Sequence, residues 1–335
     1  MSDGAAALAA FAPDGARGRA VDLRVRDHLA RSLESIATAA EGAIACDAPG
    51  IRALAAAVRA HPVRPAVMAT YADAVLVLEG EDEAAAEALL AALADPALRR
   101  PALPRIVTLR DEHLGPGNAG RYRSHTNDDP TVPTLFDPLG DAAFDQARAR
   151  VEDAAALAAR ALPALAAEIA AVAPETLLVV PSPSAEYIFH GAANFYLWGA
   201  ILLNPEAHRS RVKLVEGLAH ESGHAVLLGA TLGAPMVENP DSERFPSPLR
   251  HDPRPMDGII HAACVLARMA WAMDGLAASG LLSAAEQEEA RAARARIGRD
   301  FADAARVVRD HARCTPAGAV AFDGAQAYMA EVAVA

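Results

Sequence analysis

Residues 217–229, with the sequence GLAHESGHAVLLG, place two histidines four positions apart and a glutamate directly after the first of them. Residues four apart lie on one face of an α-helix, so His220 and His224 can converge on one metal ion. Glu221 is turned about 100° away from His220, so it can reach a metal-bound water rather than the metal itself. The apolar residues on both sides favour a partly buried metal-binding helix over two histidines on a solvated surface.

The segments around this helix predict a small sheet before it and a second helix after it. Short apolar runs at 176–181, 186–191 and 197–205 favour strands. We expect one helix from about 206 to 228 and another from about 256 to 276, with a loop between them that carries six prolines. This order is similar to that of the zincin-type metalloproteases, as an analogy of fold alone. The expected fold is therefore α+β, mostly α with a small β-sheet: a zincin-like sheet, a metal-binding helix and a second packing helix.

The rest of the chain is typical of a helical scaffold with connecting loops. Apolar residues recur at helical spacing from about 22 to 98, and nothing in this part suggests catalysis. Residues 111–140 are rich in Gly, Pro, Asn and Asp, which predicts a long irregular lid, binding loop or linker. The tail after residue 313 has no clear period. We expect a helical N-terminal region at 1–105 and an HExxH metal-binding domain at 106–335, or one continuous domain.

Composition excludes several classes of protein. The net charge of −12 argues against a broad nucleic-acid-binding surface. The chain has only three cysteines, which are far apart and do not form a C-x-x-C pair, as expected for a reducing compartment. No signal peptide and no membrane-spanning segment are expected, which favours a cytoplasmic location. The oligomeric state is left open.

A third metal ligand is expected downstream, because two protein ligands rarely suffice. His261 lies in the apolar segment GIIHAACVLARM, which predicts a helix packed across the metal helix. Glu243 follows His224 with eighteen residues between them, a spacing that resembles that of the glutamate zincins, but it lies among prolines. We favour His261 and keep Glu243 as the alternative.

The proline-rich stretch 247–255, SPLRHDPRP, places two arginines near the expected mouth of the site. A guanidinium group grips a carboxylate through two parallel hydrogen bonds, so Arg250 and Arg254 could hold an anionic ligand. Alternatively, they pair with nearby acidic residues such as Asp252 and brace the loop. The pattern leaves both interpretations open.

The combination of HESGH with SPLRHDPRPMDGIIHA and VLARM resembles a bacterial family of HExxH-domain peptide-modifying proteins. These are 2-oxoglutarate-dependent peptide β-hydroxylases that act on ribosomally made precursor peptides. The resemblance is best over residues 186–273, about a quarter of the chain. It implies iron(II) as cofactor, and 2-oxoglutarate, O2 and a precursor peptide as substrates.

The resemblance also implies a role for each site residue. His220, His224 and His261 would bind iron; Arg250, Arg254 and Ser247 would hold 2-oxoglutarate; and Glu221 would order a water or hydrogen-bond a ligand. The usual non-haem iron site has two histidines and one carboxylate, so a site of three histidines departs from that pattern. If the usual pattern holds, Glu243 is the third ligand.

His190 and Asn194 flank the strand that is expected to line the cleft, where a peptide substrate could add as a further β-strand. Alternatively, they are turn residues, with Asn194 capping a loop. Three functions follow from the whole pattern. The first is peptide hydroxylation with iron and 2-oxoglutarate. The second is a zinc metallopeptidase in which Glu221 is the general base. The third is a scaffold that keeps a metal for stability.

Overall fold

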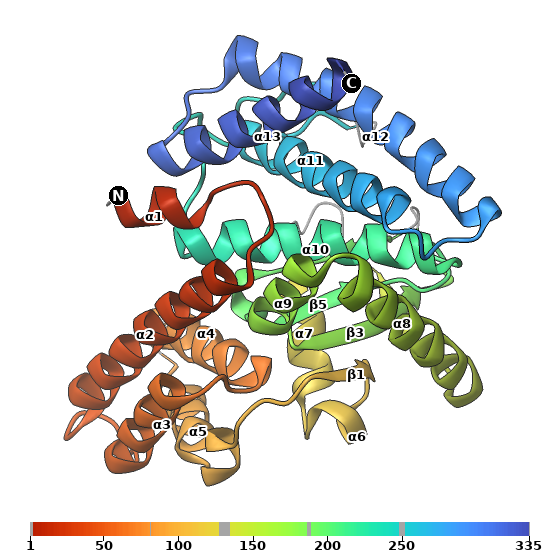
Figure 1. The fold of residues 1–335 in the computed structure, drawn as a ribbon. Helices are drawn as coiled ribbons and strands as arrows, with labels where there is room; N and C mark the ends of the chain where they lie inside the picture. The colour runs from red at the N-terminus through yellow and green to blue at the C-terminus, as the bar shows by residue number, and fades with distance from the viewer. Residues whose placement is uncertain (1–2, 81, 127–134, 186–188, 248–251, 335) are drawn as a thin grey trace.

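The computed structural model describes residues 3–80, 82–126, 135–185, 189–247 and 252–334 (Figure 1). The chain is mostly helical and contains a small mixed sheet of five strands, which confirms the expected α+β class. The helices are α1 (Asp3–Leu8), α2 (Gly15–Ala40), α3 (Ala48–Ala60), α4 (Pro65–Glu79), α5 (Glu83–Ala94), η1 (Pro96–Arg99), α6 (Asp111–Leu114), α7 (Asn118–Thr126), α8 (Asp141–Ala161), α9 (Pro163–Val172), η2 (Phe195–Leu197), α10 (Arg211–Thr231), α11 (Met256–Ala278), α12 (Ala284–His311) and α13 (Pro316–Val334).

The sheet is built around β3 (Glu175–Pro181), whose central residues 177–180 are apolar. It pairs in parallel with β1 (Arg105–Thr108) and β5 (Ala200–Leu203), and antiparallel with β2 (Phe136–Pro138). The last strand, β4 (Gly191–Ala192), pairs antiparallel with β5, at one edge of the order β1-β3-β5-β4. Since parallel strands are covered on both faces, the continuous apolar run of β3 is what such a strand requires.

Two groups of buried side chains cover the two faces of the sheet. Leu178, Ile201 and Leu203 belong to the large core, which also takes in α2, α8, α9, α10 and α11. Leu177 and Leu202 face a smaller core under α4, α6 and α7. The large core includes residues from both sides of position 105, so apolar packing continues across the expected domain boundary. The division at residue 105 stays a prediction.

Several expected elements differ from the observed ones. The helix expected to bind the metal, α10, begins at Arg211 rather than Glu206, because Ser210 caps it by accepting a hydrogen bond from the Lys213 N–H at 3.0 Å. The start of the expected strand 197–205 is instead η2 and a turn. The stretch 111–140 contains α6, α7 and β2, and the tail forms α13. Residues 186–188 of the expected strand 186–191 lie outside the described residues.

Helix α11 packs on α10 as expected, and its length and apolar composition single it out among the described helices. By length and composition it could cross a membrane, but 83% of the relevant window is buried inside the protein. This burial is typical of a core helix. Figure 1 shows α11 lying along α10, with α12 and α13 on its other side.

A buried ion cluster ties the N-terminal segment to α9 and α11. Arg268 of α11 pairs with Glu168 of α9, and these side chains are 3% and 0% exposed. Arg17 reaches the same carboxylate at 3.2 Å, and the Asp14 N–H donates to it at 3.0 Å. Arg268 also donates to the Phe11 carbonyl oxygen at 3.0 Å. Three segments distant in sequence therefore meet at one buried ion cluster.

The three cysteines are free thiols in different surroundings. Burial leaves Cys264 2% exposed and raises the pKa of its thiol to about 12, whereas Cys46 and Cys314 are partly exposed. Because the thiolate is the reactive form, we expect iodoacetamide to label Cys46 and Cys314 in the native protein and Cys264 only after unfolding. Peptide mass mapping checks this expectation, with urea-unfolded protein as the control. Equal labelling of Cys264 and Cys46 in the native protein would contradict it.

Candidate metal centre

Helices α10 and α11 bring three imidazole rings together. His220 and His224 lie one turn apart on α10, and their Nε2 atoms are 3.2 Å apart. His261, on the facing side of α11, places its Nδ1 atom 3.4 Å from Nδ1 of His224. His224 is thus the central ring and contacts a different histidine through each of its nitrogens. The sequence expectation that these residues meet is consistent with this packing.

Hydrogen-bond partners indicate which nitrogen of each ring carries the proton. The Met269 thioether, 3.1 Å from Nδ1 of His220, can only accept, so His220 donates from Nδ1 and keeps a lone pair on Nε2. Nε2 of His261 faces Asp257 Oδ2 at 3.9 Å, which favours a proton on Nε2 and a lone pair on Nδ1. With the proton of His261 on Nε2, Nδ1 of His224 would be the donor in the contact with His261, and the Nε2 atoms of His220 and His224 would both carry a lone pair.

Burial keeps these histidines uncharged. It lowers the pKa of His220 to about 4, with His208 adding a smaller effect in the same direction. Burial, followed by the neighbouring His220 and His261, holds the pKa of His224 well below its ordinary value. Burial also lowers the pKa of His261, against the opposing effect of Asp257. Neutral imidazole is the form that binds metals, so the rings are suited to a metal at neutral pH.

The distance between the two Nε2 atoms fits a shared ion. Two nitrogens bound at 2.0–2.1 Å with a tetrahedral angle lie roughly 3.3 Å apart, close to the observed 3.2 Å. The same distance fits a hydrogen bond between a protonated and an unprotonated ring, so it allows a shared divalent metal but does not require one. Within the described residues, however, no group of three or more His, Cys, Asp and Glu side chains is arranged as a metal site.

The two candidates for the third ligand, His261 and Glu243, lie in different surroundings. His261 lies directly beside His224 and contacts Nδ1 of that ring, the nitrogen that does not contact His220. In this position it can orient the His224 ring. The two oxygens of Glu243 contact Asn239 at 2.9 Å and Arg313 at 3.7 Å. Of the two candidates, His261 is thus the one brought next to the pair. Direct ligation by His261 stays a prediction.

Glu221 is buried beside the histidine pair and is only 4% exposed. Its Oε1 atom lies 3.9 Å from Nε2 of His220, and its Oε2 atom has no hydrogen-bond partner within the described residues. Burial raises the pKa of this carboxyl to about 8. Gly191 of β4 makes room for it, since an added Cβ would lie 2.3 Å from Oε1. The site therefore holds a carboxyl group that is free to bond a ligand.

The raised pKa of Glu221 predicts a pH effect on the metal-free protein. Its pKa in the folded state, about 8, exceeds its ordinary value of 4.5, so the folded protein binds more protons between these two pH values. Stability from this group is therefore fully present below about pH 4.5 and is lost as the pH rises towards 8. We expect Glu221→Gln to raise the free energy of unfolding at pH 8 by on the order of a few kcal/mol, and much less at pH 5.

Urea unfolding of the metal-free wild type and the Gln variant at both pH values measures this effect. Glu243→Gln is the matched control, because Glu243 is partly exposed and paired. The same change in stability at pH 5 and at pH 8 would contradict the expectation.

The expected 2-oxoglutarate residues are only partly described. Arg250 lies outside the described residues. Arg254 pairs with Asp252 Oδ2 at 3.6 Å, and its backbone exchanges two 2.9 Å hydrogen bonds with Phe245. This is the bracing role that the sequence left open, although the Arg254 side chain stays 31% exposed. Ser247, at the end of the described part of this loop, is partly buried.

The expected substrate residues lie at the edge of the sheet. His190 directly precedes β4, and its ring meets that of His208 edge-on, with centroids 5.9 Å apart. The side chain of Asn194 accepts a hydrogen bond from the Tyr196 N–H at 2.8 Å and so caps η2. The capping role kept as the alternative is thus what Asn194 performs in this structure. Substrate contact by either residue stays a prediction.

Nothing in the sequence indicated a role for three residues that lie around the site: Met269, Gly191 and His208. Met269 lies eight positions after His261, on the same face of α11. Because its neighbours in sequence are mostly apolar, no pattern singles it out. The His208 ring is fixed by its Nδ1 contact with the Asn204 carbonyl oxygen at 2.9 Å. Its Nε2 atom faces Gly217, where an added Cβ would approach to 2.8 Å.

Comparison with known proteins gives no family: no family model matches the chain, and no curated protein has a significantly similar sequence. The site brings together a pair of neutral imidazoles, a third imidazole beside one of them and a buried carboxyl group.

Proposed function

We propose that this protein is an iron(II)- and 2-oxoglutarate-dependent hydroxylase that modifies the β-carbon of a side chain in a ribosomally made precursor peptide. The observation that carries the proposal is the convergence of the His220 and His224 Nε2 atoms, 3.2 Å apart, beside the buried Glu221 carboxyl. The choice of iron and 2-oxoglutarate rests on the resemblance of HESGH and SPLRHDPRPMDGIIHA to the peptide β-hydroxylases.

In this proposal His220 and His224 hold the iron, and His261 either completes the ligand set or fixes the orientation of His224. When bound, iron(II) with 2-oxoglutarate and O2 supplies the oxidation: 2-oxoglutarate becomes succinate and CO2, and one oxygen atom enters a C–H bond of the peptide. The partly exposed guanidinium of Arg254, with Arg250 and Ser247, would hold the distal carboxylate of 2-oxoglutarate.

The position of β4 supports a peptide as the substrate. This short strand is at the sheet edge and is antiparallel to β5, and its Gly191 lies against the Glu221 carboxyl. An extended peptide that pairs with β4 would therefore run past the histidines. An edge strand followed by a metal helix is also the zincin-like feature expected from the sequence. Below about pH 8 Glu221 is mainly protonated, so it can donate a hydrogen bond to a ligand.

One observation favours a second candidate, a zinc metallopeptidase. The free Oε2 atom of Glu221 lies close to the histidine pair, where a general base would accept a proton from water. A bound dication would lower the pKa of this carboxyl and so increase its ionised fraction. On this alternative, Glu221→Gln abolishes peptide cleavage while zinc binding is retained.

The experiment that tests the proposal compares both chemistries on one preparation. Protein purified without O2 is loaded with iron(II) or with zinc, and is then given 2-oxoglutarate, O2 and synthetic peptides from short reading frames beside its gene. The proposal predicts succinate and a peptide heavier by one oxygen atom, with iron only. Labelled casein serves as a general peptidase substrate. Casein cleavage with zinc and no succinate with iron would replace the first candidate by the second.

A further inference from the structure

A groove separate from the histidine site runs between α11, α12 and α13. Its volume is about 770 Å³. Phe301 and Met329, which are 6% and 8% exposed, form its apolar floor over the buried Met273, with small residues of α12 beside them. Its charged lining residues are Arg291, Arg294, Arg299, Arg309 and Asp274. None of the proposed iron, 2-oxoglutarate or substrate residues lines it, so it calls for an explanation of its own.

One face of α12 forms the long wall of this groove. Arg291 and Arg309 are eighteen positions apart, or about five turns, and so lie on the same face at opposite ends. Ala295, Gly298 and Ala302 follow between them at helical spacing. The two arginines are therefore separated by about 27 Å along the helix. Small side chains along this length leave room for the apolar ridge of another helix.

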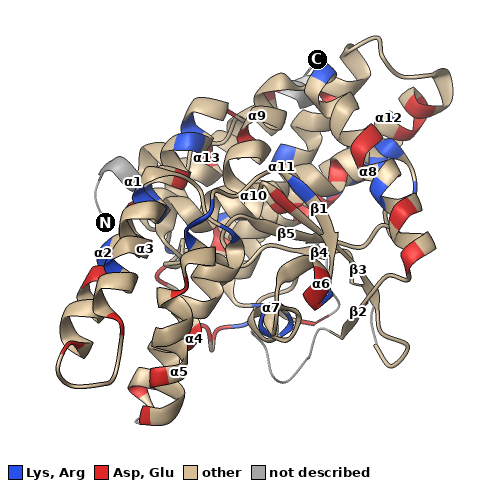
Figure 2. Cartoon of the chain, turned by 90° about the horizontal axis from the view of Figure 1, so that it is seen from below, with Lys and Arg blue, Asp and Glu red and all other residues tan. Residues whose placement is uncertain are grey.

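The charge of the groove is basic, although the protein as a whole carries −12. Its one aspartate, Asp274, is already paired with Arg294 at 2.9 Å and accepts a hydrogen bond from Tyr328. In the described part of the chain, the ion-pair partner of Arg291 is the exposed Glu288 on its own helix. Arg299 and Arg309 form no ion pair within the described residues. In the view of Figure 2 acidic and basic residues are interspersed over the outer helices, so this basic groove is a local feature.

We propose that this groove binds an acidic amphipathic helix of a partner polypeptide. Such a helix would lay its apolar ridge on Phe301 and Met329, and its carboxylates would reach Arg291 at one end and Arg309 at the other. A nucleic acid would use the arginines but gain little from the apolar floor. The proposal does not rest on the proposed hydroxylase function, because no residue is shared with that site.

The test uses the full chain and two synthetic peptides. The first is a fluorescein-labelled helix of about five turns, with leucine on one face and glutamate on the other. The second has the same leucine pattern with lysine in place of glutamate. Fluorescence anisotropy is expected to show saturable binding of the acidic peptide that weakens with added salt, and at least about tenfold weaker binding of the basic one.

Two variants locate the binding. Arg291→Glu/Arg309→Glu is expected to weaken binding of the acidic peptide by about tenfold or more. The control, Arg31→Glu/Arg148→Glu, makes the same charge change at exposed helix arginines elsewhere and should leave binding unchanged. Ala302→Trp fills the wall of the groove without changing its charge and should also weaken binding. Circular dichroism verifies that each variant folds.

Three outcomes would overturn the proposal. The first is no saturable binding of the acidic peptide. The second is equal loss in the groove variant and the control variant, which would indicate a general charge effect. The third is tighter binding of single-stranded DNA or of anionic vesicles than of the acidic peptide, with the same dependence on Arg291 and Arg309.

Discussion

Alanine in place of His224 is expected to lower the affinity for iron(II) by about a hundredfold or more while the protein stays folded. His224 is the central ring of the site, since its two nitrogens contact His220 at 3.2 Å and His261 at 3.4 Å. Removing it takes away one of the proposed iron ligands and also the contact with His261. The loss of an outer partner alone typically costs 10–100-fold in metal affinity, and the loss of a ligand costs more.

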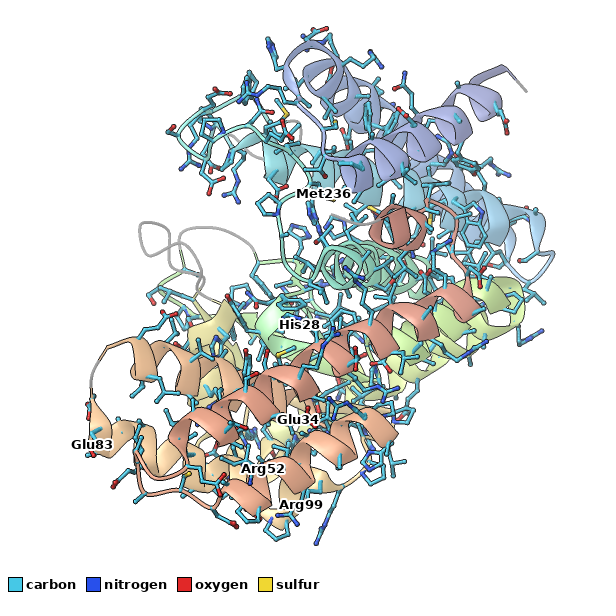
Figure 3. All side chains as sticks on the ribbon, turned by 90° about the vertical axis from the view of Figure 1, so that its left-hand side faces the viewer. His28, Glu34, Arg52, Glu83, Arg99 and Met236 are labelled. Carbon is cyan, nitrogen blue, oxygen red and sulfur yellow. The ribbon has the colours of Figure 1, made fainter. Side chains whose placement is uncertain are left out.

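Anaerobic calorimetry of iron(II) binding measures this effect, and circular dichroism shows whether the variant is folded. The matched control is His28→Ala on α2, a helix far from the site in sequence, where Figure 3 labels this residue. Met236 marks the neighbourhood of the site in Figure 3, because its N–H donates at 2.6 Å to Asp257, which faces His261. Glu34 of α2 and Arg52 of α3, labelled in the same view, lie away from it. Unchanged iron affinity in His224→Ala would rule out the histidine pair as the iron site.

Arg268→Ala is expected to lower the free energy of unfolding by about 3–5 kcal/mol. Its partner Glu168 is fully buried, so the substitution leaves a buried carboxylate with only Arg17 and the Asp14 N–H to stabilise it. The Phe11 carbonyl oxygen also loses its donor. Because this cluster joins the N-terminal segment to α9 and α11, the effect should be global rather than confined to one helix.

Urea unfolding measures this loss of free energy of unfolding, provided that its dependence on urea concentration is the same in the variant and the wild type. Arg31→Ala is the matched control: its ion pair with Asp27 is 64% and 46% exposed, so its removal should cost less than about 1 kcal/mol. Arg268 also packs against α10 near the site, since a Cβ added to Gly223 would lie 3.1 Å from its Nε atom. A cost for Arg268→Ala no larger than that of the control would mean that the cluster does not stabilise the fold.

The elements with strong local patterns could be predicted from the sequence. The continuous apolar run of β3 and the 3.6-residue period around HESGH indicated a sheet followed by the metal helix. Helix α11 was predicted to within two residues at its end, since its apolar residues repeat without interruption. Helices α7 and α13 were missed because glycine, asparagine and alanine blur the period in those segments.

The sequence indicates the juxtaposition of His220, Glu221 and His224 through their spacing within one helix, α10. His261 was expected to pack nearby from the apolar character of α11, and the structure places it beside His224, but its role as a ligand stays a prediction. The neighbours that define their chemistry depend on tertiary packing. Met269 fixes the proton of His220 across two helices, and Gly191 makes room for Glu221 from a strand. No pattern in one sequence places these residues together.

The central claim is that His220 and His224 bind one catalytic metal ion and that this ion is iron(II). The most direct measurement is an anaerobic titration of the metal-free wild type with iron(II), followed by 2-oxoglutarate, with heat and metal content recorded together. We predict one iron per chain, and binding of 2-oxoglutarate only after iron is bound. A protein that takes up no iron, or that binds 2-oxoglutarate equally well without it, would contradict the account.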